Sequence, residues 1–282
     1  MTKPGLESDR ARLWRDPHLD GMELLHARYV THAFAPHAHE TFAIGVVLAG
    51  ALSFSYRKER EIISSGEVMV INPHEMHTGQ AVGAQGCTYR MLYPSATALQ
   101  EIAVALAARS RSALFFPASR IVDESLAQLV LRLHLALEDT GTPCLERETR
   151  LLGMLTELVR FHAEVGATLD RSGPRGAAWI PQAVDYLETH FADDVSLQQM
   201  AAALNVSPFH LLRTFRAEVG APPHAFLTQI RIRHAKQLLS RGLPIVQVAA
   251  DTGFSDQSHL TRCFRQAVGI TPGQYQCSCL VG

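Results

Sequence analysis

Three histidines in the first third of the chain could bind a ligand through their imidazole nitrogens: His37, His39 and His77. His37 and His39 are two residues apart, so on a β-strand both side chains lie on the same face. His77 follows a run of strand-forming residues that begins after Gly66, and it could converge with the other two. Three imidazoles are sufficient to hold zinc, and imidazole also suits nickel.

These histidines have three interpretations. They could hold a divalent metal ion, line a small-molecule effector pocket, or lie on the surface near the mouth of a barrel. A metal site would also need partners that orient the rings, and Glu40 and Glu75 are close in sequence. A pocket for a carboxylate-bearing metabolite would combine the histidines with an arginine such as Arg90. The pocket of His37, His39, His77 and Arg90 is our first hypothesis, and the metal site is the second.

Basic residues between Ser207 and Arg241 form a second group that could do chemistry. They are Arg213, Arg216, Arg231, Arg233, Lys236 and Arg241, against the single acid Glu218. The whole chain carries a net charge of -1, so this excess is local. A basic stripe on helices indicates phosphate binding, whereas a merely solvated face usually mixes both signs. This pattern favours DNA.

The sequence around these basic residues is duplicated. An offset of 48 pairs Ala201 with Ala249 and Asn205 with Gly253. After one extra residue the offset becomes 49, and it pairs Leu211 with Leu260, Arg213 with Arg262, Phe215 with Phe264, Val219 with Val268, Gly220 with Gly269, Pro223 with Pro272 and Phe226 with Tyr275. Small, apolar, basic and glycine positions therefore stay in step, which indicates a repeated supersecondary unit.

Each copy has the pattern of a helix, a tight turn and a second helix. Ser196 can cap the first helix, and Ser207 can cap the second. Asn205 stands where a chain leaving a helix often needs a left-handed conformation, and Gly253 does so in the second copy. Ser255 and Asp256 follow Gly253 and can cap the second helix of that copy, as Ser207 does in the first. This is the pattern of a helix-turn-helix, whose second helix enters the major groove of DNA.

A basic helix over Ala225–Leu239 joins the two units. The second unit ends in Gly-Phe-Ser-Asp-Gln-Ser-His-Leu-Thr-Arg-Cys-Phe-Arg and then Gly-Ile-Thr-Pro-Gly-Gln-Tyr. This arrangement resembles the AraC/XylS family of transcription regulators. The resemblance spans Gln182 to Gln276. It implies a regulator rather than an enzyme, with double-stranded DNA and RNA polymerase as partners. The two recognition helices would enter successive major-groove turns, about 34 Å apart.

Helical spacing selects the residues that could touch DNA. In the first copy Leu211 and Phe215 form the inward stripe, and in the second copy Leu260 and Phe264 do. The DNA-contact candidates are therefore Phe209, Leu212, Arg213, Arg216, Gln257, Ser258, His259 and Arg262. Phe209 and Arg213 match positions that often meet bases in related regulators. A phosphate-only role for Arg213 is the alternative.

The chain from Leu24 to Tyr93 has the pattern of a small antiparallel barrel or jelly roll. The expected strands are Phe42–Leu48, Ala51–Tyr56, Ile62–Ile63 and Val68–Ile71, with a turn at Ala49-Gly50. The stretch from His37 to His77 is similar to the cupin-type effector domain fused to many regulators of the same family. Cupin enzymes place a metal-binding glutamate a few residues after the His-x-His pair, where this chain has Ala43 and Ile44.

Two amphipathic helices are expected after the barrel, over Ser125–Glu138 and Glu146–His162. The stripe with Leu151, Leu155, Leu158 and His162 could pack on the barrel, pair two subunits of a homodimer, or do both. The sequence thus predicts an α+β chain with three parts: residues 1–165 as a cupin-like effector and dimerisation domain, 166–177 as a Gly- and Pro-containing linker, and 178–282 as the DNA-binding domain.

The remaining features favour a cytoplasmic protein. There is no apolar run long enough to cross a bilayer, and the polar N-terminus is unlike a signal peptide. The five scattered cysteines match no zinc pattern and fit a reducing compartment. We therefore predict a ligand-responsive, sequence-specific DNA-binding transcription regulator. The alternatives are a metal-dependent cupin enzyme or metal sensor with a DNA-binding tail, and an architectural DNA binder without an effector.

Overall fold

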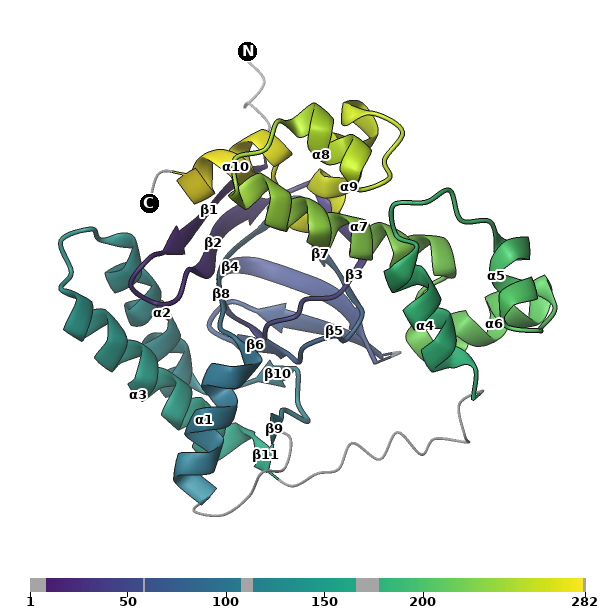
Figure 1. Cartoon of the computed structure of the whole chain (residues 1–282). Coiled ribbons are helices and arrows are strands. Elements are labelled where there is room, and N and C mark those ends of the chain that lie inside the picture. Colours follow the sequence, from purple (N-terminus) through teal and green to yellow (C-terminus); the bar gives the residue numbers. More distant parts are fainter. Residues whose placement is uncertain (1–8, 58, 108–113, 166–177, 281–282) are drawn as a thin grey trace, which may run out of the picture. The chain divides into compact units, whose positions relative to one another are not determined.

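A computed structural model describes residues 9–57, 59–107, 114–165 and 178–280, without the side chains of Ala107, Val165 and Phe209 (Figure 1). The chain forms two compact units that divide between Leu169 and Asp170. The expected linker, residues 166–177, lies outside the described residues. The first unit is an antiparallel sheet with helices and the second is all-helical, which confirms the predicted α+β class.

The N-terminal unit is built on a nine-stranded sheet. Its strands are β1 (Arg10–Asp16), β2 (Met22–Tyr29), β3 (Ala33–His37), β4 (Ala43–Tyr56), β5 (Glu59–Ser64), β6 (Val68–Ile71), β7 (His77–Ala81), β8 (Cys87–Tyr93) and β10 (Arg120–Ile121). Six of them follow the order β1-β2-β8-β4-β6-β10, while β5 and β7 pair with β4, and β3 pairs with β7. Phe34–Ala38 is part of this sheet through the pairing of β3 with β7. A separate small sheet joins β9 (Leu114–Phe115) to β11 (Glu164–Val165).

The long strand β4 pairs with different strands along its length. Its first part, Ala43–Val46, pairs with β6, and its last part, Ala51–Tyr56, pairs with β5. The expected turn at Ala49-Gly50 is wrong, because the strand continues through a register shift there. Gly50 has a φ of +75°, and a Cβ at this position would come within 2.0 Å of the Gly86 carbonyl oxygen. The glycine signal therefore marks a bulge that redirects the strand.

Helices α1 (Ala96–Ala107), α2 (Glu124–Glu138) and α3 (Cys144–His162) pack on one face of the sheet. Their shared core includes Leu92 and Ile44 from the strands and Leu133 and Leu158 from the helices, all essentially without exposed surface. Burying a leucine or isoleucine side chain contributes about 1.5–3 kcal/mol. The sequence predicts α2 and α3 to within two residues, whereas it gave no expectation for β1 or α1.

The C-terminal unit contains seven helices among the described residues. They are α4 (Ile180–Thr189), α5 (Leu197–Ala203), α6 (Pro208–Val219), α7 (Pro223–Ser240), α8 (Ile245–Asp251), α9 (Gln257–Val268) and α10 (Pro272–Leu280). Helix α7 contacts α4, α6, α8, α9 and α10, so it connects the two repeated units. Across the described ranges, no helix has the length and apolar character needed to cross a membrane.

Candidate nucleic-acid interface and effector site

The two helix-turn-helix copies have matching helices at nearly constant sequence offsets. Helices α5 and α8 have seven residues each at an offset of 48, and α6 and α9 have twelve each at an offset of 49. The extra residue of the second copy therefore lies in the turn. Both turns contain a left-handed residue, Asn205 with φ 53° and Gly253 with φ 73°. Asparagine tolerates this conformation better than most residues with a Cβ.

Each recognition helix begins at a side-chain cap. The His210 N–H donates to Ser207 Oγ at 3.2 Å, and the His259 N–H donates to Asp256 Oδ1 at 2.7 Å. These bonds satisfy main-chain donors that have no partner inside the helix. The expected capping roles of Ser207 and Asp256 are confirmed.

The inward faces of both recognition helices are alike. Leu211, Phe215, Leu260 and Phe264 have 0% exposed surface. Phe215 packs edge-on against Phe226 with ring centroids 5.6 Å apart, and Phe264 packs in the same way against Tyr275 at 5.4 Å. The repeated aromatic pair fixes the angle of each recognition helix against the next helix.

The opposite faces leave most predicted DNA-contact residues open to solvent. Exposed side chains are Leu212, Arg213, Arg216, Gln257, Ser258 and Arg262. His259 is half-buried, with its ring 5.3 Å from that of Phe254 and its Nδ1 3.1 Å from Ser255 Oγ. The side chain of Phe209 lies outside the described residues. The arrangement can present two arginine-bearing helices to DNA.

The basic stripe of the linking helix is only partly available to phosphate. Arg231 on α7 donates to the main-chain carbonyls of Phe191 at 2.7 Å and Asp193 at 2.8 Å, and burial lowers its pKa. Arg233 forms an ion pair with Glu188. These two arginines hold α4 and the loop after it, so the expectation that they belong to a phosphate-binding stripe is wrong. Spacing along one helix gives no indication of a carbonyl from another.

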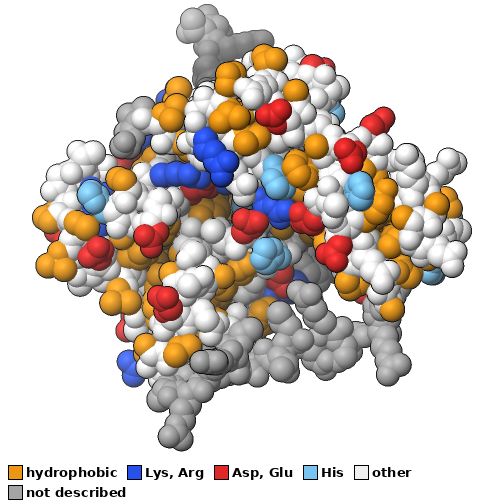
Figure 2. Space-filling view, in the orientation of Figure 1, with side chains coloured by type: hydrophobic (Ala, Val, Ile, Leu, Met, Phe, Trp, Pro, Cys, Tyr) orange, Lys and Arg blue, Asp and Glu red, His pale blue; other side chains and the backbone are white. Residues whose placement is uncertain are grey.

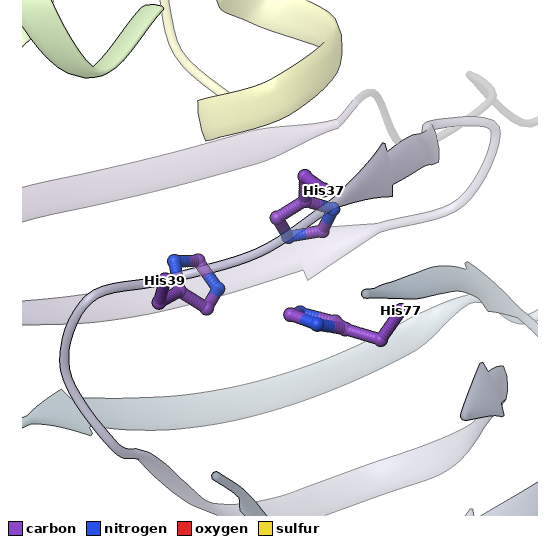
Figure 3. A group of neighbouring side chains, drawn as sticks. All are labelled: His37, His39 and His77. Atoms are coloured by element: carbon purple, nitrogen blue, oxygen red, sulfur yellow. The ribbon is translucent and has the colours of Figure 1, made fainter. Parts of the chain in front are cut away.

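In the N-terminal unit, the imidazoles of His37, His39 and His77 point toward one another (Figure 3). One nitrogen from each ring lies within 4.8 Å of the others. His37 comes from β3 and His77 from the paired strand β7, while His39 follows β3 in a loop. His37 and His77 are buried and His39 is half-buried. The convergence predicted from the His-x-His spacing is therefore present.

Main-chain carbonyls orient two of these rings. His37 Nδ1 lies 2.8 Å from the Ala35 carbonyl oxygen, and His77 Nδ1 lies 3.0 Å from that of Glu75. A carbonyl can only accept, so each Nδ1 carries a proton, and in a neutral ring Nε2 then carries the lone pair. Burial lowers the pKa of His77 to about 4, and this ring is neutral at pH 7.

Two family models cover most of these residues. The model of an AraC-like ligand-binding domain matches residues 21–155, and the model of a helix-turn-helix domain matches residues 200–277. The chain belongs to the AraC family of transcription regulators. This family consists of regulators and not of enzymes, so the cupin-enzyme alternative is rejected. The ligand-binding match likewise rejects a purely architectural DNA binder.

Relatives of this AraC-family regulator match it over nearly their whole length. The chain is 28% identical over 255 residues to the uncharacterized HTH-type transcriptional regulator YbfI of Bacillus subtilis strain 168, covering 90% of this chain and 91% of YbfI. It is 26% identical over 248 residues to the HTH-type transcriptional activator RhaS of Salmonella heidelberg, covering 85% and 86%. ToxT from Vibrio cholerae O395, solved bound to (E)-4-(8-methylnaphthalen-1-yl)but-3-enoic acid, has the same fold, with a TM-score of 0.52 at 10% identity over 97% of this chain and 100% of that one.

The regulator's Arg90 does not join the histidines. Its Nη1 lies 2.6 Å from Glu138 and 2.9 Å from His134 Nδ1, both on α2. Tyr93, whose ring centroid is 5.1 Å from that of His39, is three residues along β8 from Arg90. An odd separation turns two strand side chains to opposite faces. The arginine therefore faces the helices while Tyr93 faces the histidines.

The predicted orienting acids also have other positions. Glu40 is exposed, and the Glu75 carboxylate accepts from Arg57 at 2.8 Å and from the Tyr56 hydroxyl. Burial and this carboxylate raise the pKa of Tyr56 to about 12. Glu75 contributes to the histidine cluster through its carbonyl instead.

Proposed function

We propose that this AraC-family regulator binds a two-part operator, with one recognition helix reading each part. The supporting observation is the repeated exposed arginine: Arg213 and Arg262 occupy equivalent positions on α6 and α9. Arginine recognises guanine through two hydrogen bonds in the major groove. Leu212 and Arg216 would accompany Arg213, and Gln257, Ser258 and His259 would accompany Arg262. Phe209 stays a predicted contact.

Selection of bound sequences from random duplex DNA, followed by footprinting, tests this proposal. We expect two short conserved blocks about one helical turn apart, because the recognition helices would enter successive major grooves. A single conserved block would leave one of the two helices without a base-reading role. Binding without sequence preference would reject base reading altogether. Salt concentration must be constant, since phosphate contacts dominate affinity.

The N-terminal unit is proposed as the effector-binding part of a cytoplasmic regulator, with residues 1–165 as the sensor, 166–177 as the linker and 178–282 as the DNA-binding domain. Its match to the AraC-like ligand-binding model supports a small-molecule effector. The same unit has three convergent histidines, two of them buried and one half-buried. A change in operator affinity when the effector is added would support the proposal, and RNA polymerase is the expected partner in transcription.

The proposed homodimer would use the outer faces of α2 and α3 rather than the predicted leucine stripe. Leu155 and Leu158 are buried in the core, so that stripe serves packing. Exposed apolar side chains remain on the two helices (Figure 2), namely Leu129, Leu135, Leu145, Leu152 and Phe161. Leu152→Glu should give a folded monomer, and Leu155→Glu should unfold the unit. Size-exclusion chromatography beside circular dichroism separates these results, and an unchanged dimer in Leu152→Glu would remove this interface.

A further inference from the structure

The histidine cluster has the dimensions of an unassembled metal site. Nitrogen–zinc bonds are about 2.0–2.1 Å long, so two nitrogens on one tetrahedral ion lie about 3.3 Å apart. The three candidate nitrogens are all within 4.8 Å of one another. Small rotations of the imidazoles would bring them onto one ion. His37 and His39 come from β3 and the loop after it and His77 from β7, and the three rings converge on one point (Figure 3).

The protonation of the rings matches this chemistry. The Ala35 and Glu75 carbonyls fix the proton of His37 and His77 on Nδ1, and Nε2 is then the ligating atom. A carbonyl bonded to the far nitrogen is the usual second-shell partner of a metal-binding histidine. These carbonyls belong to the strand β3 and to the turn before β7, so the orientation is built into the main chain.

An anionic effector suits the same place less well. Arg90, the cation expected to bind a carboxylate, is paired with Glu138 on the other face of β8. Neutral imidazole is a good ligand for divalent ions of the first transition series, above all zinc, nickel and copper.

We propose that His37, His39 and His77 bind one divalent transition-metal ion, zinc or nickel, with a fourth position left for water or another donor. The inference rests on the proposed function, since it names the kind of ligand that the N-terminal unit receives. Two of the histidines lie on β3 and the loop after it, and the third lies on the paired strand β7. A change in the β3–β7 pairing would therefore change the distances between the ligands.

Metal titration of the full-length chain, stripped with a chelator and then given Zn²⁺ or Ni²⁺ in competition with a chelating dye, tests the inference. We expect one ion per chain. His39→Ala should weaken binding by at least about 100-fold, because loss of a ligand should cost no less than loss of a second-shell partner. His18→Ala is the matched control, since His18 is exposed in the turn between β1 and β2. Equal affinity in the His39 and His18 variants would overturn the proposal.

X-ray absorption at the metal edge of the unsubstituted chain keeps the test independent of any variant's folding. Three imidazole ligands and no sulfur are expected. Sulfur ligands would assign the ion to the cysteines, and fewer than three imidazoles would also reject the site. Operator footprinting with and without metal is a separate measurement. If the chain does not bind metal but still responds to an organic effector, this inference alone is rejected. If sequence-specific DNA binding is absent both with and without metal, the proposed function is rejected.

Discussion

The two helix-turn-helix copies are alike inside and different outside. At equivalent buried positions, Leu211 matches Leu260 and Phe215 is repeated as Phe264. On the exposed face, Leu212 corresponds to a threonine at position 261 in the second copy. The arginines keep their type, with Arg213 matching Arg262 and Arg216 matching position 265, and so does one histidine, with His210 matching His259. The shared residues thus build the scaffold.

This difference indicates how one duplicated unit can read two DNA sequences. Packing constrains the buried residues because a core tolerates little change in volume. The exposed side chains do not pack in this core, so they are available for base contacts. The retained arginines suit guanine or phosphate in both halves of an operator. The turn tolerates an inserted residue, since both versions place a left-handed residue after the first helix.

The largest expected effect comes from breaking the shared core. Leu211→Ala and Leu260→Ala should each lower the free energy of unfolding of the helical unit by about 2–5 kcal/mol, since each removes a fully buried side chain and leaves a cavity. Denaturant unfolding followed by circular dichroism measures the change. Leu212→Ala is the neighbouring control, and its half-exposed side chain should change stability by less than about 0.5 kcal/mol. Equal losses for Leu211 and Leu212 would contradict the assigned inward face.

A smaller and more selective effect is expected from the matched arginines. Arg213→Ala should cost about 1–3 kcal/mol of binding free energy at one base pair of one operator half, and Arg262→Ala should do the same in the other half. Site selection with each variant would show which half loses its preference.

Lysine substitutions sharpen this test. Arg213→Lys keeps the charge but loses the paired hydrogen bonds, so it should relax specificity while preserving most of the salt dependence. Uniform weakening on every sequence would instead assign the arginine to phosphate alone. If footprints of both halves disappear together at all protein concentrations, the two copies do not act as separable readers.

Local signals explain why the helical unit was predictable. Caps such as Ser207 and left-handed positions such as Asn205 depend on residues close in sequence, and the repeat is found by aligning the chain with itself. Each is present in the structure. The interactions of Arg231 were not predictable, because its partners lie 38 to 40 residues away in the chain.

The N-terminal unit depends more on non-local pairing, and the sequence predicted it less completely. Strand β6 has the expected bounds, yet the Ala49-Gly50 turn is a bulge inside β4. A glycine with positive φ fits both a turn and a bulge, and only the partner strands decide between them. His37 and His39 converge although His39 lies in the loop after β3, where strand alternation no longer applies. Alternation along β8 excludes Arg90 once the faces of that strand are known.

The smallest expected effect concerns the caps, which differ in kind between the two copies. Ser207→Ala should cost about 0.5–2 kcal/mol, as for other lost N-caps, at any pH where the unit is folded. Asp256 caps α9 with a carboxylate, and the N–H of His259 lowers its pKa below the ordinary 3.8. A carboxylate whose pKa is lowered by folding stabilises the folded state at pH values above its pKa in the unfolded chain. That stabilisation is lost as the pH falls through its pKa in the folded state. Thermal unfolding between pH 2 and pH 5 should therefore show an acid-dependent part that disappears in Asp256→Asn, which caps without titrating. If the pH dependence persists in that variant, another carboxylate causes it.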